Sequence, residues 1–329
     1  MSFKPKTLEE AALEVVLDFF RNGLKQKSIL DFKRKIANSL PPRIKSQLMQ
    51  KLISDISLSD KLRLNCLEIF LNEKTKDFSF IQTPWDYPSG LSLIQMLPKL
   101  SPKIEKMNLS QIYMRPENKQ DFRNLLKQCN NLKSLRVKCC PYECAIYQLL
   151  LTKEYDKLDR DVQIGLHKIE YINLDCRVNP ADVAKLFKRL PELQGLGVFQ
   201  DLGEGLSHYI DSYDHPNRTL NIVEIYDLNT SFETLENFAK FCPNANLISI
   251  DNPGEGVIEN LHQFPLLSEL HLYLFDTNEL MRFLTQHGKK IKKLNLTNPL
   301  RRLNIDKSSL YSLCPELLEL NMMKMPLGI

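Results

Sequence analysis

Apolar residues recur along most of the chain in a six-residue pattern whose first, fourth and sixth positions are apolar. Because successive side chains of a strand point to opposite faces, we expect each hexad to form a short strand that contributes an apolar pair to a shared core. The pattern occurs nine times, starting at Ile104, Leu132, Ile169, Leu193, Leu220, Ala245, Leu267, Ile291 and Leu317.

The hexads are regularly spaced, and the segments between them have helical patterns. Their starts lie 22 to 37 residues apart, and most intervals fall in the range of about 20 to 29 residues that is typical of one strand plus one helix per repeat. Residues 179–190, for example, begin with Asn179 as a helix cap and Pro180 at the first helical position. The longer interval between Leu135 and Ile169 is compatible with an exposed loop or with a longer helix.

This arrangement resembles the leucine-rich-repeat family over residues 104–322. The expected fold class is therefore α/β, a leucine-rich-repeat solenoid with a small all-helical N-terminal head. The expected domains are a helical head at 1–60, a helical connector and N-terminal cap at 61–103, and a solenoid of about nine repeats at 104–329.

The head is predicted to be helical and unusually apolar. Residues 7–20 begin with Thr7 and Glu10 at capping-box spacing and are apolar over more than half of the helix circumference. Residues 24–38 predict a more basic helix, and residues 39–53 predict another with one apolar stripe. One interpretation is that these helices only cap the first repeat. The alternative is that one apolar face docks on the repeats and a second face binds a partner.

Charge and hydropathy exclude several function classes. The net charge of +4 arises in residues 1–60, which contain 11 basic and 7 acidic residues. The rest of the chain contains 33 basic and 33 acidic residues. This distribution predicts no nucleic-acid groove. The sequence has no membrane-spanning apolar stretch and no apolar signal core at its start, so we expect no membrane partner and a cytoplasmic or nuclear location.

Neither the cysteines nor any sequence motif indicates catalysis. Cys129, Cys242 and Cys314 each lie three residues before a hexad, where other repeats carry Leu or Phe, so we expect buried structural thiols. Residues 139–144 contain three more cysteines but lack the second ligand pair of a zinc site. Phosphate loops, nucleophile elbows and metal-binding histidine spacings do not occur. The sequence therefore predicts no enzyme activity, no cofactor and no metal.

Two short motifs in the head resemble adaptor-binding boxes. The first has the spacing of an Elongin-binding box, and it consists of Thr7, Leu8, Ala12 and Val16. The second matches the cullin-binding box of von Hippel-Lindau-type receptors, and it consists of Leu40, Pro41, Ile44 and Leu48. Followed by leucine-rich repeats, the pair resembles the ZYG-eleven and ZER family of ubiquitin-ligase substrate receptors. Ala12 stands where that family usually has cysteine, and the chain lacks the further helical repeats of the family.

The second motif also resembles the start of an F-box. The segment "LPPRIKSQLMQKL" has Leu-Pro followed by apolar residues at F-box offsets, although the spacer from Leu52 to Asp60 is longer than in that family. An F-box would imply a Skp adaptor in place of Elongin B/C. Both resemblances imply that the head binds an adaptor linked to a cullin while the repeats hold a protein substrate. The remaining alternative is a leucine-rich-repeat scaffold without a ligase role.

The face of the strands opposite the core is rich in aromatic and acidic residues. Aromatic side chains are common interface anchors, and carboxylates favour a basic segment on the target. An ordinary solvated sheet face is the alternative interpretation. The residues predicted to bind the target are Tyr171, Phe199, Glu224, Tyr226, Asp251, Glu269, His271 and Tyr273.

Overall fold

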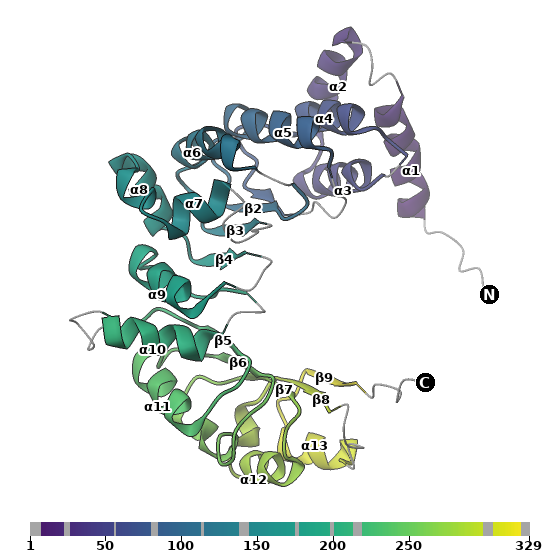
Figure 1. The fold of residues 1–329 in the computed structure, drawn as a ribbon. Coiled ribbons are helices and arrows are strands. Elements are labelled where there is room, and N and C mark those ends of the chain that lie inside the picture. The colour runs from purple at the N-terminus through teal and green to yellow at the C-terminus, as the bar shows by residue number, and fades with distance from the viewer. Residues whose placement is uncertain are drawn as a thin grey trace, which may run out of the picture. The chain divides into compact units, whose positions relative to one another are not determined.

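The protein is a mixed α/β chain with parallel strands (Figure 1). The computed structural model describes residues 8–22, 27–55, 57–79, 85–112, 115–137, 145–174, 178–197, 201–212, 219–298 and 305–323. The chain divides into two compact units, unit 1 (Met1–Leu166) and unit 2 (His167–Ile329). This division lies between the second and third hexads, within the region that the sequence predicted as one series of repeats.

Unit 1 begins with four helices and continues with alternating strands and helices. The helices are α1 (Leu8–Arg21), α2 (Lys27–Ser39), α3 (Pro42–Ile53), α4 (Asp60–Phe70), α5 (Tyr87–Leu100), α6 (Lys119–Gln128), α7 (Ala145–Leu151) and α8 (Arg160–His167). The strands are β1 (Asp77–Phe78), β2 (Lys106–Leu109) and β3 (Ser134–Val137). β2 pairs in parallel with both β1 and β3. The described part of the long interval after the second hexad contains two helices, α7 and α8, joined by a connection at residues 152–159 that includes a single 3₁₀ turn.

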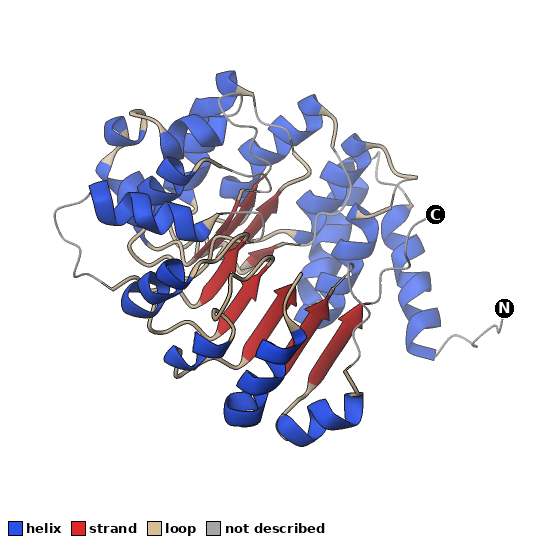
Figure 2. Cartoon of the chain, turned by 60° about the horizontal axis from the view of Figure 1, so that its bottom comes forward, coloured by secondary structure: helices blue, strands red, loops and turns tan. Residues whose placement is uncertain are grey.

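Unit 2 contains a five-stranded parallel sheet whose strands follow their sequence order, β5 to β9 (Figure 2). The strands are β4 (Tyr171–Asn173), β5 (Glu224–Asp227), β6 (Leu247–Ile250), β7 (Glu269–Tyr273), β8 (Lys293–Thr297) and β9 (Glu319–Met323). The helices are α9 (Pro180–Arg189), α10 (Leu202–Ser212), α11 (Phe232–Phe241), α12 (Thr277–His287) and α13 (Lys307–Leu313). The predicted start of α9 is confirmed, because the Asn179 side chain accepts a hydrogen bond from the Asp182 N–H.

Burial of the apolar hexad positions explains the strands. In the eighth hexad, Ile291, Leu294 and Leu296 are each at most 1% exposed. Burying a side chain of this size contributes about 1.5–3 kcal/mol, so the repeated pattern supplies a continuous core. The described residues of the hexad at Leu193 form an isolated bridge, from Gly195 to Tyr171. The backbone leaves the extended region at Gly197, where φ is +71°, and this explains why the extended segment is short among these residues.

The fifth hexad starts two residues later than the sequence pattern predicted. Ile225 pairs with Ile248, and Asp227 pairs with Ile250, so this hexad begins at Ile222 and the predicted start at Leu220 is wrong. Asp227 occupies the last core position, where the other hexads of the sheet have an apolar residue. Because strand side chains alternate with a period of two, the shift leaves the predicted outward-facing residues on the same face.

The three cysteines next to hexads have the predicted structural role. Cys129, Cys242 and Cys314 are at most 1% exposed, and each directly follows the last residue of a helix. Burial raises the pKa of Cys129 and Cys242 to about 12 and that of Cys314 to about 11. These thiols therefore remain protonated at neutral pH and behave as small apolar side chains.

Asp227 is a buried carboxyl group that connects β5 to two neighbouring segments. One carboxyl oxygen accepts a hydrogen bond from the Gly203 N–H at 2.8 Å, near the start of α10. The other accepts from the Thr230 hydroxyl at 2.7 Å, just before α11. The pKa of Asp227 is raised to about 6, mainly by burial and also by the charge of nearby Asp201, while the hydrogen bonds from Thr230 and Gly203 lower it in part.

Replacing Asp227 with Asn should change how the stability of unit 2 depends on pH. The pKa of Asp227 rises from 3.8 to about 6 on folding, so the folded protein retains a proton that the unfolded chain loses. Stability should therefore fall as pH rises from about 4 to about 6. Asn keeps an oxygen that can accept from the Gly203 N–H, and it cannot ionise. Asp227→Asn should therefore remove this dependence of stability on pH, and the variant should be on the order of 1–3 kcal/mol more stable than the wild type at pH 7.

The measurement is amide hydrogen exchange of β5 and β6 between pH 4 and pH 7, corrected for the intrinsic pH dependence of exchange. Asp211→Asn, at an exposed position of α10, is the matched control and should behave as the wild type. Identical pH profiles for Asp227→Asn and the wild type would contradict the assignment.

Candidate partner-binding surfaces

Helix α1 has two apolar faces, and the described residues of unit 1 cover one of them. Leu17 and Phe20 are buried, and the Phe20 ring lies 4.8 Å from the Phe70 ring of α4. Val15 and Phe19 lie on the other side of the helix and are 72% and 40% exposed. A helix that only capped the repeats would need a single apolar face.

An exposed aromatic residue of α2 extends this second face. Phe32 is 57% exposed, and its ring meets the Phe19 ring edge to face with 6.5 Å between the centroids. Val15, Phe19 and Phe32 are called the outer apolar patch below. Large apolar side chains exposed together are typical of binding surfaces.

A buried lysine fixes the end of α1 beneath this patch. Lys33 of α2 is 2% exposed, and its ammonium group donates hydrogen bonds to the main-chain carbonyls of Phe19, Phe20 and Asn22. These carbonyls lie at the C-terminal end of α1, where a cation is favourable. Burial lowers the pKa of Lys33. The same ammonium lies 5.1 Å from the Phe19 ring centroid, so it also supports the patch from below.

Arg21 attaches α1 to the end of α3. Its Nε and Nη2 atoms lie 3.0 and 2.6 Å from the same Asp55 carboxylate oxygen. Its Nη1 atom pairs with Asp18 at 2.7 Å. Together with Lys33, this ion pair holds α1 against both of its neighbours while the outer apolar patch stays uncovered by the described residues.

The structure separates the predicted adaptor-binding residues into different environments. Thr7 lies outside the described residues, as do the side chains of Leu8 and Ala12, although both belong to α1. Val16, Leu40 and Ile44 are half-buried, and Pro41 is exposed directly before α3.

Leu48 requires a correction, because it is completely buried. It belongs to the inner stripe of α3, and a residue without exposed surface cannot contact an adaptor. The sequence pattern could not distinguish the stripe that packs against α4 from a stripe that binds a partner.

The sequence analysis did not select Val15, Phe19 or Phe32 as site residues. The signal for the first two was the broad apolar sector of α1. Phe32 had a weaker signal, as the only aromatic residue in an otherwise basic helix.

Replacing Lys33 with Met should destabilise unit 1. Met preserves the aliphatic length but leaves the carbonyls at the end of α1 without their donor, which costs about 1–3 kcal/mol. Trp85 is the only tryptophan of the chain and lies buried in unit 1, so its fluorescence during urea unfolding reports on this unit. Lys35→Met, at an exposed position of the same helix, is the control. Equal unfolding midpoints for Lys33→Met and the wild type would refute the role given to Lys33.

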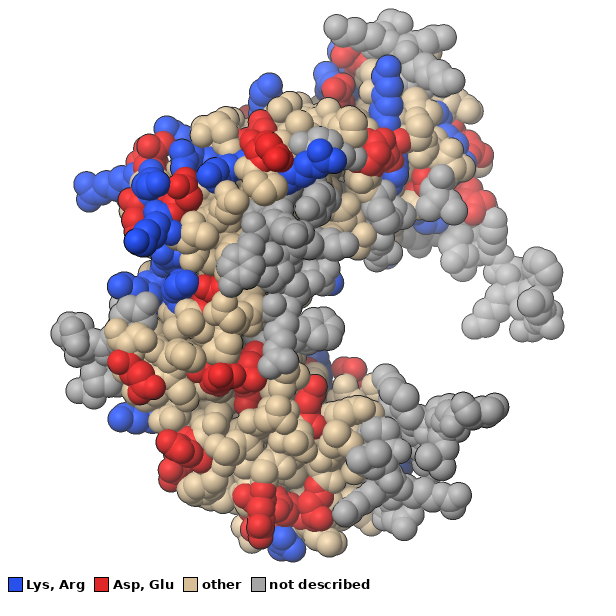
Figure 3. Space-filling model, viewed as in Figure 1, with Lys and Arg blue, Asp and Glu red and all other residues tan. Residues whose placement is uncertain are grey.

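The second candidate surface is the outer face of the sheet in unit 2. The strand registers place Glu269 between Leu247 and Lys293, and His271 between Ser249 and Asn295. Tyr171, Glu224, Tyr226 and Tyr273 are half-buried on the outer face, Asp251 is exposed, and Phe199 lies outside the described residues. Figure 3 shows acidic side chains spread over unit 2 on the face that it draws.

A glycine allows two of these side chains to converge. A Cβ atom at Gly195 would lie 3.1 Å from both a Glu224 carboxylate oxygen and the Tyr171 ring. Burial, followed by the charge of Glu269, raises the pKa of Glu224. Burial and then Glu224 raise the pKa of Tyr226 to about 12. Burial is the main cause of both shifts, and the carboxylates Glu224 and Glu269 add to them. It is these carboxylates that give the face a negative potential, which would favour a cation.

The carboxylates of this face differ in how far they are already paired. Glu269 accepts from His271 Nε2 at 3.0 Å and pairs with Lys293 at 3.3 Å. Among the described residues, Glu224 and Asp251 have no ion-pair partner. These two carboxylates are therefore better placed than Glu269 to bind a cationic group of a target.

The described residues offer neither a membrane-spanning helix nor a cluster of metal ligands. No helix among them is long and apolar enough to cross a bilayer. No group of three or more His, Cys, Asp or Glu side chains among them could hold a metal ion. The cysteine-rich segment 139–144 lies outside the described residues.

Comparisons with known proteins find similarity at the level of structure alone. No protein-family model and no curated protein sequence matches the chain. The chain is similar to the crystal structure of the yeast Rad7 and Elc1 complex, at 13% identity and a TM-score of 0.46, covering 95% of this chain and 92% of that chain.

Two further solved structures are similar over smaller parts. The complex of TLR13 with ssRNA13 has 14% identity and a TM-score of 0.33, with 69% of this chain and 40% of that chain covered. Internalin C2 from Listeria monocytogenes has 11% identity and a TM-score of 0.33, with 72% of this chain and 93% of that chain covered. All three TM-scores are low, so the role of this chain has to follow from its own residues.

Proposed function

We propose that this chain is the substrate-recognition subunit of a cullin-RING ubiquitin ligase, in which the head binds Elongin B/C and the repeats bind the target protein. The observation that carries the proposal is the outer apolar patch on α1 and α2. It continues, along α1, the stripe of residues whose spacing resembles an Elongin-binding box. The patch lies on a helix whose position is fixed by Lys33 and Arg21, so it is preorganised for a partner.

The energetics favour a protein partner for this patch. Covering a large apolar side chain contributes about 1.5–3 kcal/mol, and Phe19 and Phe32 supply two adjacent aromatic anchors. Around them lie Asp18 and Asp31, each paired with an arginine of its own helix. An apolar centre with a charged rim is the usual composition of a protein interface.

The location of the exposed apolar surface favours Elongin over a Skp adaptor. Leu48 belongs to both the cullin-binding box and the F-box segment, so its complete burial does not distinguish the two adaptors. The exposed apolar surface lies on α1 and α2, which the F-box resemblance does not explain. A cullin would contact the start of α3, where Pro41 is exposed.

The repeats would form a leucine-rich-repeat solenoid that positions the target. The hexad spacing along the sequence supports this part of the proposal, as does the sequence order of the parallel strands in unit 2. The chain itself would do no chemistry. Its contribution is to hold the target near a ubiquitin-charged enzyme, and such proximity alone can lower a barrier by several kcal/mol.

Charges introduced into the outer apolar patch should abolish adaptor binding. We expect Val15→Asp with Phe19→Asp to weaken binding of purified Elongin B/C at least tenfold, because an unpaired carboxylate would be buried at each anchor. Calorimetry or pull-down with purified components measures this effect. Ile164→Asp, at another exposed apolar position of unit 1, is the matched control and should bind as the wild type.

Each outcome of this binding experiment has a distinct meaning. Failure of the wild-type chain to bind Elongin B/C would refute the proposal in its Elongin form. Binding of a Skp adaptor instead would support the F-box alternative. Binding of neither adaptor would favour a leucine-rich-repeat scaffold.

The sheet face should select targets through its two unpaired carboxylates. We expect Asp251→Lys with Glu224→Gln to reduce captured targets at least tenfold, because a basic segment would lose its counter-charges. Quantitative mass spectrometry of proteins captured from extract at two salt concentrations measures the loss. Glu233→Lys with Glu236→Lys, on exposed positions of α11, should leave the captured set unchanged. An identical set with all variants would exclude the sheet face as the target site.

A further inference from the structure

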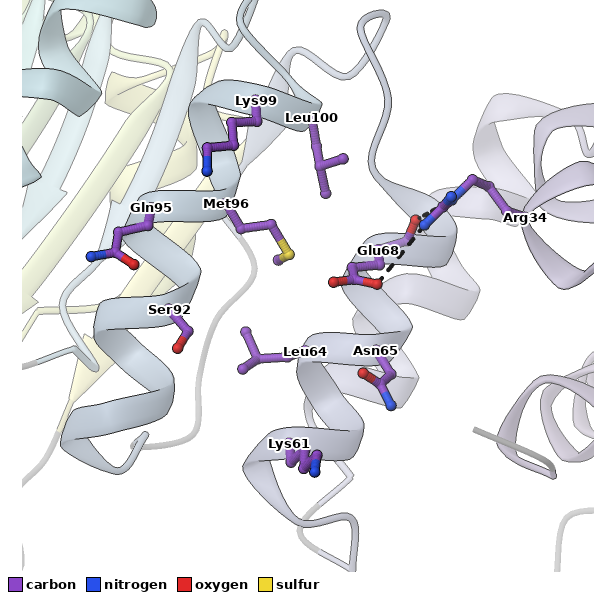
Figure 4. Close-up of a pocket in the computed structure, with 10 residues that line it drawn as sticks. All are labelled: Arg34, Lys61, Leu64, Asn65, Glu68, Ser92, Gln95, Met96, Lys99 and Leu100. Carbon is purple, nitrogen blue, oxygen red and sulfur yellow. Dashed lines mark hydrogen bonds and ion pairs between the residues drawn. The ribbon is translucent and has the colours of Figure 1, made fainter. Parts of the chain in front are cut away.

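Unit 1 also contains a groove between α4 and α5 that the proposed function does not use. It has a volume of about 480 Å³ and is lined from α4, α5 and one residue of α2 (Figure 4). The lining residues are Arg34, Lys61, Leu64, Asn65, Glu68, Ser92, Gln95, Met96, Lys99 and Leu100.

The two helices are joined firmly next to one end of the groove. The Asp86 N–H, just before α5, donates a hydrogen bond to the Asp60 carboxylate of α4 at 2.6 Å. Arg63 of α4 pairs with the same Asp60, and its guanidinium lies 4.7 Å from the Trp85 ring centroid. The walls of the groove are therefore fixed before any ligand arrives, which reduces the entropy cost of binding.

The middle of the groove is apolar. Leu64 of α4 and Met96 and Leu100 of α5 are half-buried. In Figure 4, Leu64 and Met96 lie between the two helices, and Leu100 lies above Met96. A leucine-sized side chain inserted here would cover apolar surface on both walls, and methionine adapts readily to the shape of a ligand.

The ends of the groove are basic and unpaired. Lys61 and Lys99 lie at opposite ends in Figure 4, and neither has an ion-pair partner among the described residues. Arg34, by contrast, is occupied, because its Nη1 pairs with Asp31 at 3.3 Å and its Nε donates to the Glu68 carbonyl at 2.8 Å. The only carboxylate of the lining, Glu68, faces Arg34 at 3.9 Å. The unpaired charge of the groove is thus positive.

We infer that this groove docks an acidic segment of another protein, with an aliphatic side chain at its centre and a carboxylate on each side. The aliphatic group contacts Leu64 and Met96, and the carboxylates reach Lys61 and Lys99. The first seven residues of this chain are a poor occupant, because they contain Lys4 and Lys6 and no acidic residue. Two lysines around an apolar centre also do not form the row of phosphate contacts that a nucleic acid needs.

The inference is tested by selecting random 12-residue peptides, displayed on phage, against the full-length chain. Peptides that also bind the Lys61→Glu, Lys99→Glu variant are removed. We expect the remaining peptides to carry an aliphatic residue between acidic ones. Their affinity, measured as synthetic fluorescent peptides, should fall at least tenfold for this variant and also for Leu64→Gln. Lys51→Glu, at an exposed position of α3, is the charge control and should bind as the wild type.

The peptide selection does not depend on Elongin binding. A failure of this inference can therefore be distinguished from a failure of the proposed function. Equal urea midpoints from Trp85 fluorescence show that the variants remain folded. Failure to enrich any peptide would overturn the inference. Enrichment of basic or uncharged peptides would overturn it as well, and so would peptides whose affinity Leu64→Gln leaves unchanged.

Discussion

The alternation of side chains along parallel strands is the constraint on which unit 2 depends. In β7, Leu270 and Leu272 are buried, whereas Glu269 and His271 remain half exposed. The strand registers continue this pairing from β5 to β9. The core side chains are buried as far as β8, whereas Leu320 and Met322 of β9 are half-buried. A shift of one residue would exchange the buried and the exposed sets. The core therefore fixes the geometry of the outer face, while the side chains on that face remain free to vary.

The head obeys a different constraint, because a helix buries a sector and not alternate residues. The apolar sector of α1 is wider than the sector that Leu17 and Phe20 occupy in the core. Lys33 determines which part remains outside, since its bonds to the last carbonyls of α1 fix both the end and the rotation of that helix. A buried ammonium group is costly unless it is fully hydrogen-bonded. Its presence here means that the position of α1 is well specified, and the exposed position of Phe19 follows from that.

The apolar pattern predicted the strands and the buried cysteines because both depend on local spacing. It misplaced the fifth hexad because Asp227 fills a core position with a polar side chain. The partners of Asp227 come from α10 and from the segment before α11, and no local pattern reveals them. The burial of Lys33 was not predicted either. A lysine in a basic helix normally indicates an exposed face, and the carbonyls that bind Lys33 belong to a different helix. The groove depends on the angle between α4 and α5, which the sequence pattern does not define.

The outer apolar patch and the sheet face differ in the forces that they offer, and this difference limits what each can bind. The outer apolar patch offers hydrophobic burial, which salt weakens little, and so suits a stable subunit contact. The sheet face offers carboxylates beside tyrosines. Salt screens the attraction of these carboxylates for a cation, so this face suits a contact that forms and dissociates readily. The patch and the sheet face belong to different compact units. The hydrogen bonds of Lys33 and Arg21 that hold α1 lie within unit 1, so substitutions on β5 to β7 change none of them.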